Sequence, residues 1–120
     1  MSRRDGDFDE NCDPEHPYII KYDDVVKAAA KIKPYILSTP CMAAHTQQDF
    51  GIYIHYKMEF LQPNGSFKDR GAIFALLNLP TDKKKLGVVV ASTGNGAESF
   101  CYYGAKMNIP MVAILPYLVP

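Results

Sequence analysis

Two short apolar runs with a helical segment between them constrain the fold more than any other feature of the sequence. The runs are 87–91 and 111–115, and residues 97–107 have the pattern of a helix. Short, continuously apolar strands are typical of a parallel sheet that is buried on both faces. A strand, a helix and a parallel strand in this order form a right-handed crossover. The order of the elements therefore predicts an α/β fold with parallel strands.

The part of the chain before these runs carries further signals for helices and strands. Apolar residues recur at helical spacing over 67–79, acidic residues open a helical pattern at 23–33, and 43–49 is expected to form a short helix. Residues 52–58 are rich in β-branched and aromatic side chains and are expected to form a strand. The basic run 83–85 is expected to be a solvated linker.

Charge and hydropathy argue against several classes of function. The 13 basic and 13 acidic side chains balance, and no basic stripe is present that could neutralise phosphates, so a nucleic-acid partner is not expected. No segment is apolar over the roughly 18 residues that a membrane span needs, so no membrane partner is expected. The first residues are charged and acidic, unlike a signal or transit peptide, and a cytoplasmic protein is expected.

Cysteine and histidine residues give no sign of a metal site. The three cysteines are Cys12, Cys41 and Cys101, which lack the spacing of zinc ligands and are not expected to form disulfides. They are expected to be buried thiols that pack as small hydrophobic side chains. The three histidines share no metal spacing either, and no metal is expected.

Lys68 occupies an unusual place for a lysine. Ser66 and Asp69 resemble a capping box at the start of a helix, which puts Lys68 in the first helical turn. A cation is disfavoured there by the positive end of the helix dipole. An amine has to lose its proton before it attacks an aldehyde, and a positive neighbourhood, to which Arg70 adds, favours the uncharged form. The residues alone leave two interpretations open, a nucleophilic amine and an exposed lysine on a capped helix.

The loop Ser92–Gly96 joins the first apolar run to the helical segment that follows it. A glycine-rich junction of this kind offers free backbone N–H groups and the positive end of a helix, so it suits an anion such as a substrate carboxylate. Asn95 is expected to cap the helix, with Glu98 three residues later. A plain tight turn is the alternative. A dinucleotide-binding fingerprint is not favoured, because Ser99 stands where that fingerprint needs glycine.

The sequence around Lys68 resembles a known enzyme family over a long, ordered pattern. The pattern is Lys57-x-Glu59-x-x-Gln62-x-x-Gly65-Ser66-Phe67-Lys68-Asp69-Arg70-Gly71-Ala72. It resembles the cofactor-lysine segment of the fold-type II pyridoxal-phosphate enzymes (the tryptophan synthase β-like family), which include threonine and serine dehydratases, serine racemase, threonine synthase and cysteine synthase. The resemblance implies that Lys68 holds pyridoxal 5'-phosphate as a Schiff base and that Phe67 packs beside the cofactor ring. It also implies that Glu59 and Arg70 are structural partners.

By the same resemblance, the Ser92–Gly96 loop is the second signature of the family. Asn95 would hydrogen-bond the ring oxygen of the cofactor. The residues implied to bind the substrate carboxylate are Ser92, Thr93, Gly94, Asn95 and Gly96. Gly96 replaces a histidine that is common in dehydratases and racemases. Thr93 occupies the position of a serine that carries the second proton in racemases, so Thr93 joins Lys68 as a candidate catalytic residue.

The reaction implied by the resemblance is β-elimination from L-serine or L-threonine, which gives a 2-oxo acid and ammonia. Serine racemase and threonine synthase-like chemistry stay open as alternatives, as does a truncated paralogue without enzyme activity. The implied partners are a small amino-acid substrate and further copies of the chain in a homo-oligomer. The phosphate-binding loop of the family comes later in sequence than this chain reaches, so the 120 residues alone are expected to be inactive.

The resemblance also divides the chain into expected domains. Residues 1–16 carry few apolar side chains and are expected to be disordered or loosely attached. Residues 17–80 would open the larger, cofactor-binding domain, and residues 86–120 would open the smaller, substrate-binding domain. The implied fold is the incomplete front part of a three-layer α/β/α enzyme with a parallel sheet.

Overall fold

The computed structural model describes residues 15–45 and 51–118. Cys12 and all but the last two residues of the segment 1–16 lie outside these ranges, so the expectation of a disordered start stays a prediction. Most of the helix expected at 43–49 also lies outside the described residues. Within the described ranges, no helix has both the length and the apolar character that crossing a membrane requires.

The chain divides into two compact units, residues 1–30 and 31–120. Helix α1 (Tyr22–Ile32) makes up most of the described part of the first unit and confirms the helix predicted there. Its first turn is stabilised by Asp24, whose Oδ2 accepts a hydrogen bond from the backbone N–H of Lys21 at 2.9 Å. This hydrogen bond is the main cause that lowers the pKa of Asp24. Acidic residues in the first turn also suit the helix dipole.

Two short strands form an antiparallel pair in the second unit. β1 (Cys41–Ala43) pairs with β2 (His55–Lys57), and Ala43 lies opposite His55. β2 confirms the strand predicted at 52–58. The prediction of a helix that starts at Ala43 is wrong, because Ala43 is the last residue of β1. Pairing with a neighbouring strand decides the backbone here, which no local propensity can indicate.

The exposure of the cysteines differs from the expectation. Cys41 is exposed and Cys101 is half-buried, and neither forms a disulfide. Cys41 is exposed because all three residues of β1 face solvent. The prediction of buried thiols is therefore wrong for Cys41, and Cys101 fits it only in part.

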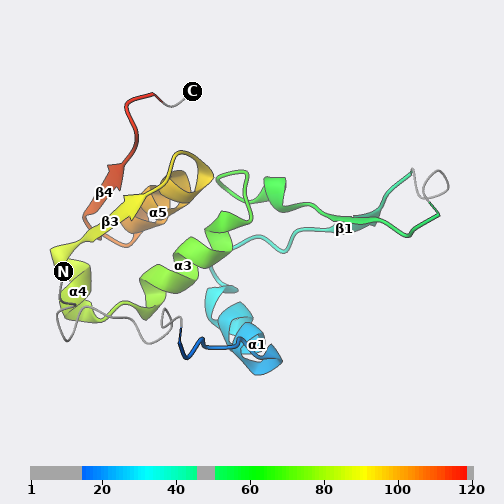
Figure 1. The fold of residues 1–120 in the computed structure, drawn as a ribbon, viewed down its shortest axis with the longest axis horizontal. Helices are drawn as coiled ribbons and strands as arrows, with labels where there is room; N and C mark the ends of the chain where they lie inside the picture. Colours follow the sequence, from blue (N-terminus) through cyan, green and yellow to red (C-terminus); the bar gives the residue numbers. More distant parts are fainter. Residues whose placement is uncertain (1–14, 46–50, 119–120) are drawn as a thin grey trace. The chain divides into compact units, whose positions relative to one another are not determined.

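The remaining elements lie in the second unit. They are, in chain order, the 3-10 turn η2 (Glu59–Leu61), α3 (Lys68–Asn78), α4 (Thr81–Leu86), β3 (Val88–Ala91), α5 (Asn95–Lys106) and β4 (Met111–Ile114). β3 and β4 pair in parallel, with Val88 opposite Met111, and α5 connects them (Figure 1). The predicted strand–helix–strand crossover and its parallel pairing are confirmed, and so is the helix predicted after Ser66.

The three lysines 83–85 belong to a helix and not to a linker. α4 contains all three and ends at Gly87, whose backbone N–H donates to the carbonyl groups of Lys83 and Lys84. Gly87 has a φ of 93°, a conformation that glycine adopts without strain. The prediction of a linker is wrong because lysine is a good helix former, and Pro80 and Gly87 bound a segment long enough for a short helix.

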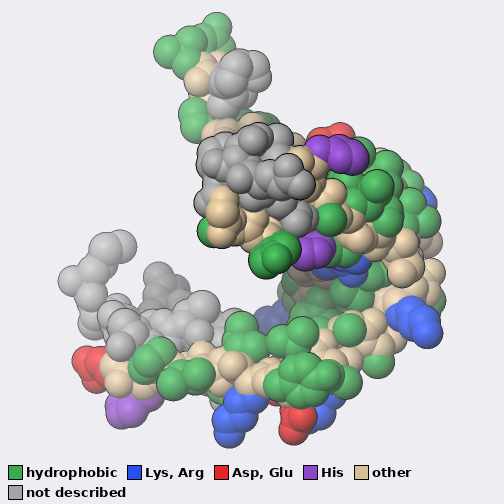
Figure 2. Space-filling model, turned by 90° about the vertical axis from the view of Figure 1, so that its right-hand side faces the viewer, with side chains coloured by type: hydrophobic (Ala, Val, Ile, Leu, Met, Phe, Trp, Pro, Cys, Tyr) green, Lys and Arg blue, Asp and Glu red, His purple; other side chains and the backbone are tan. Residues whose placement is uncertain are grey.

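The parallel strands are less buried than predicted. Half-buried and exposed residues alternate along β3, and Val89 is 64% exposed. In β4 only Met111 is half-buried, and Val112 is 56% exposed. Val88 and Met111 pack against the core, so the described residues cover one face of this sheet and the expectation of burial on both faces is wrong. Other hydrophobic side chains also remain on the surface, as the green areas of Figure 2 show.

The core of the second unit lies between α3 and α5. Ile73 and Leu76 of α3 are fully buried, and they pack with Tyr103 of α5 and with Ile109. Burial of such side chains contributes roughly 1.5–3 kcal/mol each. This packing holds side by side the two helices whose first turns carry Lys68 and the end of the Ser92–Gly96 loop.

Candidate active site

Lys68 is the first residue of helix α3, and its neighbours hold that start in place. The hydroxyl of Ser66 accepts a hydrogen bond from the backbone N–H of Lys68 at 3.2 Å, but the cap position of α3 is Phe67, which makes no side-chain cap bond, so the N-cap was predicted one residue too early. Gly65, with a φ of 66°, makes the turn that leads into the helix. Ser66 is buried, whereas Lys68 and Phe67 are exposed. The lysine amine is therefore accessible on a fixed first turn.

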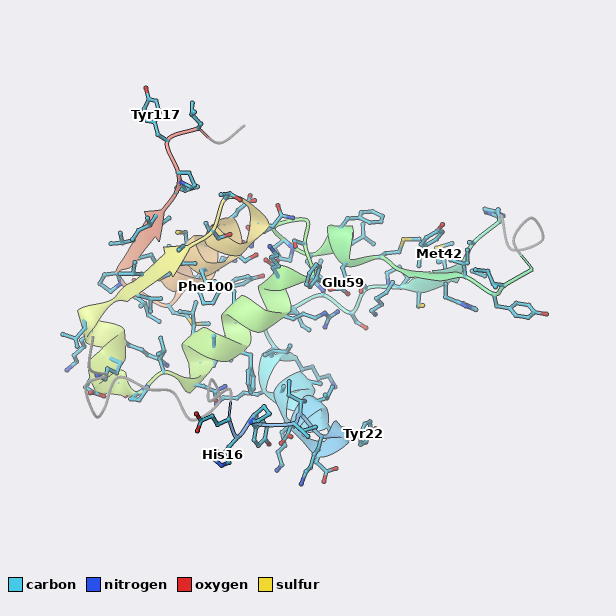
Figure 3. The ribbon with its side chains drawn as sticks, viewed as in Figure 1. His16, Tyr22, Met42, Glu59, Phe100 and Tyr117 are labelled. Carbon is cyan, nitrogen blue, oxygen red and sulfur yellow. The ribbon has the colours of Figure 1, made fainter. Side chains whose placement is uncertain are left out.

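Arg70, two residues after Lys68, is bound by Glu59. The Nε and Nη2 atoms of Arg70 donate to Oε2 and Oε1 of Glu59 at 2.8 and 2.7 Å. The hydroxyl of Thr39 donates to the same carboxylate at 2.6 Å. Hydrogen bonding to Arg70 is the largest cause that lowers the pKa of Glu59 to about 2. The predicted partnership is confirmed, and Figure 3 shows Glu59 near the start of α3.

Gln62, which is also part of the pattern around Lys68, binds the backbone of Leu37 through its side-chain amide. Its side-chain oxygen accepts a hydrogen bond from the backbone N–H of Leu37 at 3.1 Å, and its nitrogen donates to the carbonyl of Leu37 at 3.0 Å. Gln62 is buried, so these bonds satisfy an amide that water does not reach. Gln62 thus joins the segment before β1 to the turn that precedes α3.

The Ser92–Gly96 loop lies between the carboxyl end of β3 and the first turn of α5. The helix begins at Asn95, and Gly94 stands at the cap position with an extended φ of −167°. The prediction that Asn95 caps the helix is therefore wrong, since Asn95 is already the first residue of α5 and the helix begins one residue earlier than the pattern indicated. Gly94 has no side chain to bond the first N–H groups of α5, which leaves this helix start suited to an anion.

Gly96 marks the place where the loop meets Lys68. A Cβ atom added to Gly96 would lie 2.8 Å from the Oγ of Ser92 and 3.8 Å from the Cδ of Lys68. The first distance is too short for two non-bonded atoms, and the second is an ordinary contact. The missing side chain at position 96 therefore leaves room for the Ser92 hydroxyl next to the Lys68 side chain. Ser92 and Gly96 of the loop therefore lie beside the Lys68 side chain.

An open cavity of about 620 Å³ adjoins this site. Its lining residues are Ala91, Ser92, Thr93, Ile114, Leu115 and Pro116. They follow or end β3 and β4, and the carboxyl edge of parallel strands is where such sheets bind ligands. Ser92 belongs both to this lining and to the contact at Gly96. Ser92 therefore relates the cavity to the loop that lies beside Lys68.

Of the residues predicted for the site, the structure places Lys68, Ser92 and Gly96 next to one another. All seven predicted residues are exposed or half-buried, namely Phe67, Lys68, Ser92, Thr93, Gly94, Asn95 and Gly96. A primary amine, two hydroxyls and the start of a helix can react with an aldehyde and hold a carboxylate. In the part of the chain that the structure describes, no group of three histidine, cysteine or acidic side chains could hold a metal ion.

Asp69 is the residue whose role the sequence pattern did not indicate. It is fully buried, and its carboxylate accepts hydrogen bonds from Asn64, Ser99 and Tyr103. The predicted capping-box role of Asp69 is therefore replaced by contacts to another helix. Ser99 and Tyr103 are one helical turn apart, which is a usable signal for a shared face of α5, but nothing local connects them to α3.

Comparison with known proteins agrees with this geometry. The family described as pyridoxal-phosphate dependent enzymes matches residues 32–120. The chain belongs to this family. Pyridoxal phosphate is the cofactor of the family, as predicted from the pattern around Lys68. The described residues fit that cofactor, because an accessible amine on Lys68 can join its aldehyde beside a loop that suits an anion.

Three relatives show the range of the family near this chain. L-threo-3-hydroxyaspartate ammonia-lyase of Saccharomyces cerevisiae is 34% identical over 100 residues, which are 82% of this chain and 31% of the relative. A catabolic L-threonine dehydratase of Staphylococcus aureus is 30% identical over 105 residues, which are 86% of this chain and 30% of the relative. The structure of maize serine racemase matches with a TM-score of 0.78 and 31% identity, over 86% of this chain and 32% of that one.

These matches confirm the predicted fold class. The chain spans about a third of the length of the relatives it matches. Its fold is the corresponding part of a fold-type II enzyme of the α/β class, with one parallel strand pair among the described residues. The same part contains the antiparallel pair β1–β2. Of these two strands, only β2 was predicted from the sequence.

Proposed function

We propose that the protein carrying this sequence is a pyridoxal-phosphate-dependent ammonia-lyase that converts L-serine or L-threonine into a 2-oxo acid and ammonia. The observation that carries the proposal is the position of the Lys68 side chain next to Gly96 and Ser92. This position puts a primary amine beside a loop that suits a carboxylate. An amino acid offers a carboxylate and an amino group on the same carbon atom, so it can engage both parts of the site.

Each part of the site has a distinct task in this proposal. Pyridoxal phosphate, when bound, supplies an electron sink for the α-carbon of the substrate. Lys68 would hold the cofactor through its aldehyde, and its amine, once the substrate amine has replaced it there, would be free to move the α-proton. The first N–H groups of α5 and the hydroxyl of Ser92 hold the substrate carboxylate. Phe67 would cover the cofactor ring, and Asn95 would hydrogen-bond the ring oxygen.

Racemisation of serine is a second candidate, which the position of Thr93 favours. Thr93 is exposed and lines the cavity together with Ser92. A racemase needs a second proton carrier besides the lysine, because a proton must leave one face of the α-carbon and return to the other. The hydroxyl of Thr93 is a group of suitable type in the cavity. A Thr93→Ala variant would then lose racemisation and keep elimination.

Activity assays of the full-length gene product with added cofactor separate the candidates. We expect L-serine and L-threonine to yield ammonia and a 2-oxo acid. Formation of D-serine would favour the racemase, and turnover of phosphohomoserine would favour threonine synthase-like chemistry. A Lys68→Ala variant should lose turnover, whereas Lys106→Ala, which removes an ammonium 4.4 Å above the Tyr102 ring, should keep it. No turnover of any of these substrates would favour a non-enzymatic paralogue.

A further inference from the structure

Asp69 directly follows Lys68 in α3 but faces the interior. Its exposed fraction is 0%, while Lys68 is exposed. Both carboxylate oxygens of Asp69 are used on the side of the preceding loop. The side-chain nitrogen of Asn64 donates to Oδ1 at 2.9 Å, and the backbone N–H of Asn64 donates to Oδ2 at 3.1 Å. Asp69 therefore fixes the loop from which α3 starts.

The same two oxygens accept one hydrogen bond each from α5. The hydroxyl of Ser99 donates to Oδ1 at 2.6 Å, and the hydroxyl of Tyr103 donates to Oδ2 at 3.2 Å. Burial, the charge of Asp69 and the hydrogen bond to it all raise the pKa of Tyr103. The phenol therefore remains protonated and can donate throughout the physiological pH range. Ser99 and Tyr103 lie one turn apart on the face of α5 that meets α3.

These contacts join the two helix starts that make up the site. Ser99 lies one turn after Asn95, where α5 begins, and Asp69 lies one residue after Lys68. Apolar contacts between α3 and α5 have no preferred direction, so they tolerate small sliding of one helix along the other. Hydrogen bonds depend on distance and angle and do not tolerate it. The polar contacts at Asp69 therefore fix the helix starts relative to each other.

We infer that Asp69 is a positioning residue that holds the Lys68 amine against the Ser92–Gly96 loop through its hydrogen bonds to Ser99 and Tyr103. The inference rests on the proposed function, because it assigns Asp69 a task in the reaction of Lys68. Asp69 itself is buried and touches neither substrate nor cofactor in this account. Its effect is on the geometry of the amine, so it should appear in the reactivity of Lys68.

The test removes the hydrogen bonds from α5 to Asp69 but keeps other hydrogen bonds to its carboxylate. A Ser99→Ala/Tyr103→Phe double variant of the full chain removes two hydrogen bonds and keeps both bonds from Asn64. Tyr102→Phe removes the neighbouring hydroxyl of the same helix, which is not bonded to Asp69, and is the matched control. Each variant is incubated with pyridoxal phosphate at a temperature well below its unfolding midpoint. Borohydride reduction and peptide mass spectrometry then give the rate of cofactor attachment at every lysine.

We expect the double variant to attach the cofactor to Lys68 roughly fivefold more slowly, and the control to match the parent chain. Attachment at Lys106 should not change in either variant. Hydrogen exchange without cofactor gives a second readout, in which the amides of residues 92–98 should exchange faster in the double variant while those at the centre of α3 stay protected.

The outcomes separate this inference from the proposed function. Unchanged attachment at Lys68 in the double variant, together with unchanged exchange at 92–98, would overturn the positioning role and leave the proposed function intact. A parent chain that shows no preference for Lys68 would contradict the proposed function. The hydrogen exchange of residues 92–98 would still decide whether Asp69 fixes the loop.

Discussion

Glu59 shows how one residue holds together the segments around Lys68. Its side chain is 16% exposed, and its carboxylate bonds Arg70 of α3 and Thr39 of the segment before β1. The pairing of Glu59 with Arg70 was predictable from the family pattern. The bond from Thr39 was not, because no local pattern relates Thr39 to a carboxylate twenty residues later. Contacts of this kind depend on how the chain folds back.

The stability of the chain should depend on pH through Glu59. The pKa of Glu59 is 4.5 when unperturbed and about 2 in the folded chain. Ionisation of Glu59 therefore stabilises the folded state, and this contribution is fully present above pH 4.5. This contribution, about 1–2 kcal/mol after allowance for solvent screening, is lost as the pH falls from about 4.5 towards 2. Urea unfolding of the parent chain and of Glu59→Gln should differ at pH 7 and converge at pH 2.

Glu98→Gln, which changes an exposed acid, serves as the control for this measurement. It should leave the pH dependence of the unfolding free energy close to that of the parent chain. A Glu59→Gln variant with the same loss of stability on acidification as the parent chain would show that Glu59 is not the group responsible.

An alanine at position 96 should leave the stability of the fold nearly unchanged but impair the attachment of the cofactor to Lys68. Alanine favours a helix over glycine by roughly 1 kcal/mol, which offsets part of the cost of the short contact with the Ser92 hydroxyl. The new methyl group would force that hydroxyl to turn beside Lys68. We therefore expect a midpoint of thermal unfolding close to that of the parent chain and a roughly threefold or greater loss of cofactor attachment at Lys68.

Gly71→Ala is the matched control for Gly96→Ala. Gly71 is also a helical glycine, and a Cβ there would meet no atom within 4 Å. The control should stabilise the chain by about 0.5–1 kcal/mol and leave attachment at Lys68 unchanged. Equal attachment rates in the two variants would contradict the role of the empty space at Gly96.

Helices and strands were predictable where the local pattern decides them. α3, α5, β3 and β4 follow from apolar spacing and from glycine and proline at their ends. β1 was missed, and a helix was predicted where it ends, because its only support is pairing with β2 across a loop. The burial of β3 was overestimated, since an apolar run does not indicate how many of its faces the chain covers.

Gly87, at the junction between α4 and β3, should not tolerate a side chain. Gly87 has a φ of 93°, and a Cβ there would lie 2.7 Å from the carbonyl oxygen of Pro110, an atom of the backbone. The next residue, Val88, donates its N–H to that same oxygen at 2.9 Å, so the backbone cannot move away freely. Gly87→Ala should therefore destabilise the chain by roughly 2 kcal/mol or more.

Thermal unfolding followed by circular dichroism measures this change. The variant should melt well below the parent chain, whereas Gly71→Ala should melt slightly above it. A Gly87→Ala variant as stable as the parent chain would mean that the parallel pairing of β3 with β4 is looser than described here.

At the scale of the whole molecule, the chain corresponds to about a third of its relatives. The division into a larger domain opened by residues 17–80 and a smaller one opened by 86–120 stays a prediction. Closure of two such domains would exclude water from the site. Lys68 and Gly96, which lie next to each other in the structure, belong to different sides of this expected boundary.

Attachment of pyridoxal phosphate to the lysines of the chain shows directly whether Lys68 is the residue that holds the cofactor. The full chain is incubated with the cofactor, reduced with borohydride, digested and analysed by mass spectrometry. We predict that modification concentrates on Lys68, that Lys57 and Lys106 show only background, and that Lys68→Arg abolishes the main product. Labelling spread evenly over the lysines, with no preference for Lys68, would contradict the account.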